Sequence, residues 1–260
     1  MPPEKSPQEW KIPSPVIEGF HEVISPGKTG CEFAYMYRLN LTSGKEYVLD
    51  SGRLEMNVLL INGKSHIKSE KLEECMNKFD SFYIPGKTRV KIRALENCIF
   101  YIGAAECEGI GKEFFRKYIK DLPLGEIRQI HGNGVCERDV YFTLNPEVPA
   151  SRLICGITFG RNGSWTSWPP HQHGEHLEEI YCYFGMPPPG FGMHIVYCNP
   201  GKPDEITVHI VKEGDVVAMP YGYHPTVAIP GVKNTYFWIL AAKKLESRRY
   251  DLSEADRYYI

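Results

Sequence analysis

Short apolar runs alternate along this chain with glycine, proline and polar residues. The runs are rich in valine, isoleucine, tyrosine and phenylalanine, which are enriched in β-strands. Two other segments, 72–78 and 112–118, are predicted to form a helical turn or two each. The predicted strands cover residues 46–49, 56–61, 81–84, 89–92, 99–102, 153–157, 179–184, 194–197, 206–210, 216–219 and 236–241. Many short strands at roughly regular spacing predict an all-β sandwich or barrel.

The two halves of the chain resemble each other. Asp80–Gly86 reads Asp-Ser-Phe-Tyr-Ile-Pro-Gly, and Asp215–Gly222 reads Asp-Val-Val-Ala-Met-Pro-Tyr-Gly. Each segment leads to an apolar run with two alanines at its end, Ile102-Gly-Ala-Ala in the first half and Ile239-Leu-Ala-Ala in the second. This repeat predicts a duplicated β-barrel. The expected parts are a first barrel, a link and a second barrel, covering residues 1–107, 108–135 and 136–260.

Composition and charge argue against nucleic acid and membranes as binding partners of this protein. The 260 residues carry a formal net charge of −2, so no basic field favours nucleic acid or an anionic membrane. No stretch approaches the roughly 18 apolar residues of a membrane span. The polar start, Met1–Lys5, has no apolar segment typical of a secretory signal. We therefore expect a cytoplasmic protein that acts on a small molecule.

The eight cysteines include no Cys-x-x-Cys pair, so neither a thiol-zinc knuckle nor a redox motif is expected. In a large chain without an export signal, free thiols are the better interpretation. Strand edges and the aromatic end Tyr258–Ile260 favour a homo-oligomer.

Metal-binding residue types are concentrated in two segments of the second half. In Pro169-Pro-His171-Gln-His173 two imidazoles share one face of an extended segment, because side chains alternate along a strand. A glutamate pair follows closely, and Pro220-Tyr-Gly-Tyr-His224 supplies a third histidine. Three imidazole nitrogens and one carboxylate oxygen suit a first-row divalent metal, with positions left for water or substrate. Zinc and manganese are the expected ions, and iron, nickel or cobalt would also fit.

The first half lacks this chemistry. It has no His-x-His pair and no histidine just after Pro85-Gly86. Glu55 is the one candidate there for the position of the metal-binding carboxylate. We therefore expect the first barrel to be structural and the second to hold the metal.

The two histidine segments resemble the paired motifs of the cupin superfamily. Over residues 136–242 the chain looks like the 5-deoxy-glucuronate isomerases of inositol catabolism, which are related to the 4-deoxy-5-keto-uronate isomerases of pectin breakdown. The segments that carry this likeness are Arg138–Phe142, Pro149–Gly156, Asn162–His173, Leu177–Tyr181, Pro189–Gly192 and Gly214–Pro225. The resemblance implies a bicupin, two double-stranded β-helix (jelly-roll) barrels in tandem. It also implies a metal-dependent aldose–ketose isomerase that converts 5-deoxy-glucuronate to 5-keto-2-deoxy-gluconate.

Either of two adjacent glutamates could be the carboxylate ligand. The general cupin spacing after His173 favours Glu178, whereas strand phase places Glu179 on one face with Tyr181. The closer resemblance puts the ligand directly before Ile-Tyr. It implies the ligand set His171, His173, Glu179 and His224, with Glu178 at the surface or beside the ligands.

An isomerase of a sugar acid also needs a proton-transfer group and a partner for the remote carboxylate. The candidate bases are Glu178, Tyr181, Tyr223 and a metal-bound hydroxide. Arginine binds carboxylates with a bidentate fork, so Arg138 and Arg161 are the candidate carboxylate partners. Trp168 and Tyr183 are expected to line the substrate pocket.

Three other functions fit a metal-binding barrel of this kind. One is a hydrolase that opens an inositol-derived cyclic diketone with a metal-activated water. Another is isomerisation of 4-deoxy-5-keto-uronate. The third is a non-enzymatic sugar-binding cupin, which fold alone does not exclude, because function lies in the site. An intact ligand set favours an enzyme.

Overall fold

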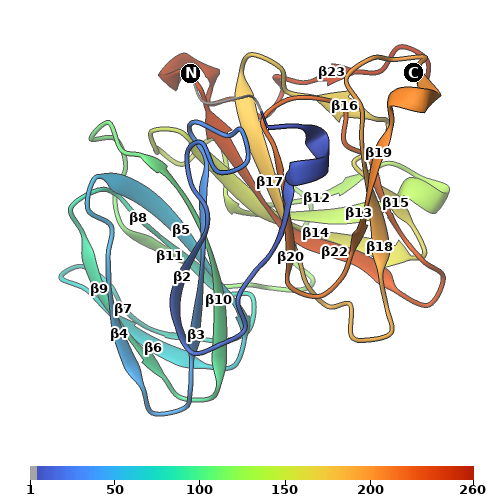
Figure 1. The fold of residues 1–260 in the computed structure, drawn as a ribbon. Coiled ribbons are helices and arrows are strands. Elements are labelled where there is room, and N and C mark those ends of the chain that lie inside the picture. The colour runs from blue at the N-terminus through green and yellow to red at the C-terminus, as the bar shows by residue number, and fades with distance from the viewer. Residues whose placement is uncertain (1–4) are drawn as a thin grey trace.

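In the computed structural model, which describes residues 5–260, strands run through most of the chain. The described helices are short 3-10 turns: η1 (Pro7–Glu9), η2 (Gly134–Cys136), η3 (Pro203–Glu205) and η4 (Leu245–Ser247). The strands form two adjacent barrels, blue to green and yellow to red in Figure 1. The all-β bicupin prediction is confirmed. Within the described range no helix is long and apolar enough to cross a membrane. The start of the chain, residues 1–4, lies outside it.

The first barrel packs a large sheet against a small one. The large sheet has the order β11 (Phe114–Arg116), β8 (Ser81–Ile84), β5 (Leu54–Asn62), β10 (Cys98–Glu106), β3 (Tyr35–Leu41) and β2 (Gly19–Ile24). The small sheet has the order β4 (Glu46–Asp50), β9 (Arg89–Ala94), β6 (Ser65–Lys68) and β7 (Glu73–Met76). Apolar side chains from both sheets, such as Val58 and Ile92, fill the space between them.

The second barrel repeats this design. Its large sheet has the order β1 (Lys11–Pro13), β20 (Asp215–Met219), β17 (Leu177–Tyr183), β22 (Lys233–Ala242), β14 (Leu153–Asn162), β13 (Arg138–Leu144) and β12 (Arg128–His131). The other strands are β15 (Trp165–Thr166), β21 (Thr226–Ala228), β18 (Gly192–Val196) and β19 (Thr207–Val211) in a small sheet, and the pair β16 (His171–Gln172) and β23 (Glu254–Ala255). This interior is more aromatic, with Tyr181, Tyr183, Tyr236 and Trp238 among its buried side chains.

The boundaries of the two barrels differ from those expected. Strand β1 pairs with β20, so the N-terminal segment belongs to the sheet of the second barrel and not the first. The expected link, 108–135, contributes β11 to the first barrel and β12 to the second. The helices predicted over 72–78 and 112–118 are wrong, because strands β7 and β11 occupy these segments and pair with β6 and β8.

The two barrels pack back to back through their large sheets. Leu59 and Tyr101 of the first barrel share one buried cluster with Ile180 and Ile239 of the second. Gly103 of β10 lies directly against the second barrel, since a Cβ atom there would stand 2.7 Å from Cγ1 of Ile239. A glycine at this position lets the two sheets come together.

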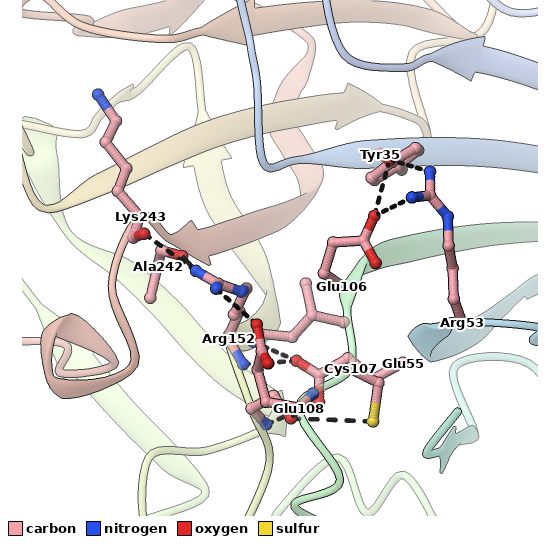
Figure 2. A network of polar contacts seen from close by, with 11 residues as sticks. Tyr35, Arg53, Glu55, Glu106, Cys107, Glu108, Arg152, Ala242 and Lys243 are labelled. Carbon is pink, nitrogen blue, oxygen red and sulfur yellow. Dashed lines mark hydrogen bonds and ion pairs between the residues drawn. The ribbon is translucent and has the colours of Figure 1, made fainter. Parts of the chain in front are cut away.

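Two buried glutamates join the barrels reciprocally. Glu55 of β5 accepts three backbone N–H bonds of 2.6 to 2.8 Å from the second barrel, donated by Ser151, Arg152 and Leu153. Glu178 of β17 accepts three of 2.8 to 2.9 Å from the first barrel, donated by Glu32, Phe33 and Ala34. Figure 2 shows Glu55 beside Arg152, which binds Glu108 and the carbonyl groups of Ala242 and Lys243. Each barrel thus binds the backbone of the other through one carboxylate.

These two carboxylates occupy equivalent positions of the duplicated fold. Glu55 lies opposite Ala105 in its sheet, and Glu178 lies opposite Ala241. The sequence comparison, which matched Ala105 with Ala242, is therefore out by one residue. The interpretation of Glu55 as the counterpart of the metal-binding carboxylate is wrong as well, because Glu55 corresponds to Glu178.

Candidate metal centre

Four side chains from three segments converge at one end of the second barrel. His171 lies on β16 and His173 just after it, Glu179 lies on β17, and His224 lies in the turn before β21. One potential ligand atom from each of the four lies within 4.8 Å of all the others. Alternation along β17 turns Glu179 into the barrel and Glu178 to the opposite face. The structure thus brings together the side chains of the predicted set, His171, His173, Glu179 and His224.

Backbone carbonyl groups orient all three imidazoles. Nδ1 of His171 lies 3.1 Å from the backbone oxygen of Pro169. Nδ1 of His173 lies 2.9 Å from that of Leu252, and Nδ1 of His224 lies 2.9 Å from that of Gly222. A carbonyl oxygen only accepts hydrogen bonds, so we assign the proton to Nδ1 in each ring. Each Nε2 then offers a lone pair to the common centre. Such support by a second hydrogen bond is typical of metal-binding histidines.

The lone pairs at this centre face one another. Oε2 of Glu179 lies 2.8 Å from Nε2 of His224 and 3.2 Å from Nε2 of His173. Oε2 of Glu179 and Nε2 of His224 are buried and lack a hydrogen-bond partner. A carboxylate oxygen beside two bare imidazole nitrogens is repulsive unless a proton or a metal ion stands between them. The residues present therefore fit a bound cation.

The pKa values of Glu179 and His171 match the protonation states of metal ligands. Burial opposes charge on Glu179, but its contacts with His173 and His224 hold its pKa well below the usual range. Burial and the neighbouring imidazoles lower the pKa of His171 to about 3. Burial works against protonation of His173, yet contact with Glu179 raises the pKa of that imidazole. A proton on His173 can thus serve as the cation in the metal-free protein, and a metal ion would displace it.

A cavity of about 360 Å³ opens beside the centre. Of the predicted site residues, it is lined by His171, His173, Glu179, Tyr181, Arg138 and Trp168. Arg138 is only 9% exposed, and its Nη1 donates to the backbone oxygens of Cys136 and Trp168. No carboxylate among residues 5–260 forms an ion pair with it. A buried, unpaired guanidinium facing a cavity is suited to bind an anion.

Besides the ligand candidate His224, four predicted site residues do not line this cavity. Glu178 is engaged at the barrel junction, where burial raises its pKa although the backbone N–H groups oppose this. Arg161 is 47% exposed and pairs with surface carboxylates. Tyr223 stacks on Tyr197, with its hydroxyl 3.5 Å from Glu254. Tyr183 points deeper into the barrel, where it bonds His194 and Thr226.

Several cavity residues were not foreseen. Tyr236 and Trp238 of β22 share a face, and their phase could have indicated them. Tyr236 stacks on Tyr181 with ring centroids 4.0 Å apart. The remaining unforeseen residues include His131, Tyr250, Asp251, Ser253 and Ala255. The last four belong to the C-terminal segment, which carries no recognisable motif.

Comparisons with known proteins agree with this architecture. A model of the KduI/IolB family matches residues 17–257. The 5-deoxy-glucuronate isomerase of Geobacillus thermodenitrificans is 30% identical over 246 residues, covering 88% of this chain and 87% of that protein. The 5-deoxy-glucuronate isomerase of Bacillus subtilis strain 168 is 26% identical, covering 95% and 94%.

Solved structures show the same fold. An IolB-like protein from Salmonella typhimurium LT2 has a TM-score of 0.82 at 22% identity, covering 96% of this chain and 97% of that one. Bacillus subtilis oxalate decarboxylase, a protein with Mn(II) centres, has a TM-score of 0.63 at 13% identity, covering 97% and 80%. With a family model matched over residues 17–257, this chain belongs to the KduI/IolB family.

Proposed function

We propose that this protein is a metal-dependent aldose–ketose isomerase that converts 5-deoxy-glucuronate to 5-keto-2-deoxy-gluconate in inositol catabolism. The convergence of three imidazoles and one carboxylate beside a cavity with a buried arginine carries the proposal. Relatives named 5-deoxy-glucuronate isomerase, aligned over most of this chain, support the choice of substrate.

The donor set suits a divalent cation of intermediate softness. Zinc and manganese are the preferred ions, and iron, nickel and cobalt accept the same ligands. His171, His173, Glu179 and His224 would hold the ion, which would supply Lewis-acid polarisation of the substrate carbonyl.

The remaining cavity residues account for substrate binding and for protonation of a substrate oxygen. Arg138 would bind the substrate carboxylate and so place the reacting carbons near the centre. Isomerisation moves one proton between neighbouring carbons and one between their oxygens. Burial and the nearby Glu179 raise the pKa of Tyr181 well above its usual range, so its phenol stays protonated at neutral pH. We therefore assign Tyr181 the role of donor to a substrate oxygen.

The test is product identity. Metal-loaded protein is incubated with 5-deoxy-glucuronate in deuterated water, and carbon NMR and mass spectrometry follow the product. We expect a ketose of conserved composition, apart from deuterium gained at the carbon that receives the proton. Chelation should abolish turnover and added metal should restore it. Gain of one water from a cyclic diketone, faster turnover of 4-deoxy-5-keto-uronate, or binding without turnover would each contradict the proposal.

A further inference from the structure

The C-terminal segment passes directly beside the metal centre. We call residues 250–256 the C-terminal strap. Its strand β23 pairs with β16, which carries His171, and Figure 1 shows the two strands side by side. Asp251, Ser253 and Ala255 of the strap line the same cavity as the ligands. The strap is therefore one wall of the site, although nearly eighty residues separate it from the His-x-His segment.

One metal ligand depends on the strap for its orientation. His171 and His224 bond carbonyl oxygens two residues before them, so their own turns set the angle of each ring. His173 instead bonds the oxygen of Leu252, 79 residues away. Loss of that carbonyl would leave His173 free to rotate or to change tautomer.

A buried carboxylate anchors the far end of the strap. Asp256 is 1% exposed, and its Oδ2 accepts a 2.7 Å hydrogen bond from the hydroxyl of Tyr197. Its backbone N–H donates to the Pro170 oxygen at 2.8 Å, directly before the His-x-His segment. A buried carboxylate without a cationic partner is costly unless its hydrogen bonds are made. The Tyr197 bond is therefore a specific attachment.

We propose that Asp256 and Tyr197 are positioning residues for the metal centre. Their bond holds the strap in place, the strap presents the Leu252 carbonyl, and that carbonyl fixes Nε2 of His173 toward the ion. The inference rests on the metal centre of the proposed function. Because coupling between two sites is reciprocal, metal binding also stabilises the strap.

The test compares two buried tyrosines in the full-length protein. Tyr197→Phe removes the hydroxyl at the anchor and keeps the ring stacked on Tyr223. Tyr141→Phe is the matched control, because Tyr141 is 3% exposed and donates to the Lys117 oxygen outside the site. Zinc affinity is measured by competition with a chromophoric chelator, and the visible spectrum of the Co²⁺-loaded protein reports ligand geometry. We expect Tyr197→Phe to weaken zinc binding about tenfold and to change the spectrum, and Tyr141→Phe to do neither.

Two variants of Asp256 distinguish an effect on the position of the strap from a general loss of folding. Asp256→Asn keeps an oxygen that can accept the Tyr197 bond and should retain most of the affinity. Asp256→Ala removes that oxygen and also the acceptor of the Tyr258 amide, so it should weaken zinc binding at least as much as Tyr197→Phe. Hydrogen exchange supplies a second readout: metal should slow exchange of the Asp256 amide in the wild type, and by less in Tyr197→Phe.

The outcomes distinguish this inference from the proposed function. Unchanged zinc affinity and Co²⁺ spectrum in both Tyr197→Phe and Asp256→Ala would overturn the role of the strap and leave the isomerase intact. A wild type that binds metal but does not isomerise 5-deoxy-glucuronate would overturn the function and leave the role of the strap. A wild type that binds no metal would overturn both.

Discussion

Two adjacent glutamates of β17 have unrelated roles, because successive side chains of a strand point to opposite faces. Glu179→Gln removes the one carboxylate of the proposed four-residue ligand set, so we expect loss of stoichiometric metal. Glu178→Gln keeps the ligand set but turns an amide NH₂ toward backbone N–H donors. We expect it to bind metal normally and to lose about 2–3 kcal/mol of unfolding free energy. Elemental analysis and urea unfolding measure the two effects, and loss of metal from both variants would contradict the assignment.

Arg138 and Arg161 form a second matched pair. Arg138→Lys replaces a planar fork with a point charge in the cavity, so KM for the sugar acid should rise about tenfold or more, with a smaller change in kcat. Arg161→Lys should leave both constants within about twofold, because Arg161 binds Glu137 and Asp139 at the surface. Steady-state kinetics on the two variants checks this. Equal losses would show that the substrate carboxylate binds elsewhere.

Strand β18 carries a histidine that the fold keeps uncharged, His194. His194 is fully buried, with Nδ1 2.7 Å from the hydroxyl of Tyr183. Burial is the main reason that the pKa of His194 lies well below 6.5, and the nearby His224 and His209 lower it further. The unfolded chain binds a proton near pH 6.5 and the folded protein does not, so stability falls as pH decreases below 6.5. One such group contributes a slope of up to about 1.4 kcal/mol per pH unit.

Replacement of His194 shows how much this residue contributes to the loss of unfolding free energy at acidic pH. His194→Gln should reduce the slope of unfolding free energy between pH 6.5 and 5 by about one proton, even if stability at pH 7 also drops. Urea unfolding of metal-free protein at several pH values measures the slopes. The exposed His176 provides the control, His176→Gln, for which the wild-type slope should persist. An unchanged slope in His194→Gln would mean that His194 is already protonated in the fold.

The sequence predicted strands and ligands correctly where the pattern lies among residues close together in the chain. Alternation and the cupin motifs indicated the main strands and the three converging histidines, whereas the cupin spacing favoured Glu178 and the closer family resemblance indicated Glu179. Residues 73–76 and 114–116 were mistaken for helix because strand pairing decides their conformation, with the neighbouring β6 in the first case and the more distant β8 in the second. Arg161 was misplaced because closeness in sequence to the histidine motif does not set the direction of a side chain, and Arg161 pairs instead with Glu137 and Asp139 at the surface. The C-terminal strap was missed because it lies far from the histidine motifs in sequence and carries no recognisable motif that would indicate its place beside them.

The two barrels form one unit, because their large sheets meet almost without clearance. Gly103→Ala would place a Cβ atom 2.7 Å from Cγ1 and 2.9 Å from Cγ2 of Ile239. We expect a loss of about 1–3 kcal/mol from overpacking. Gly125→Ala is the control, since no atom lies within 4 Å of its added Cβ and it should be nearly neutral.

Trimming the opposing side chain tests whether this contact lies between the barrels. Ile239→Ala alone should cost about 2–4 kcal/mol through the cavity it leaves. In the double variant the new methyl group enters that space, so the combined loss should fall short of the sum of the single losses by at least about 1 kcal/mol. Metal content should stay at wild-type stoichiometry in all three variants, because Gly103 and Ile239 face the barrel junction and not the ligands. Additive losses in urea unfolding would mean that the large sheets do not press on each other at this point and that the junction is looser than the structure shows.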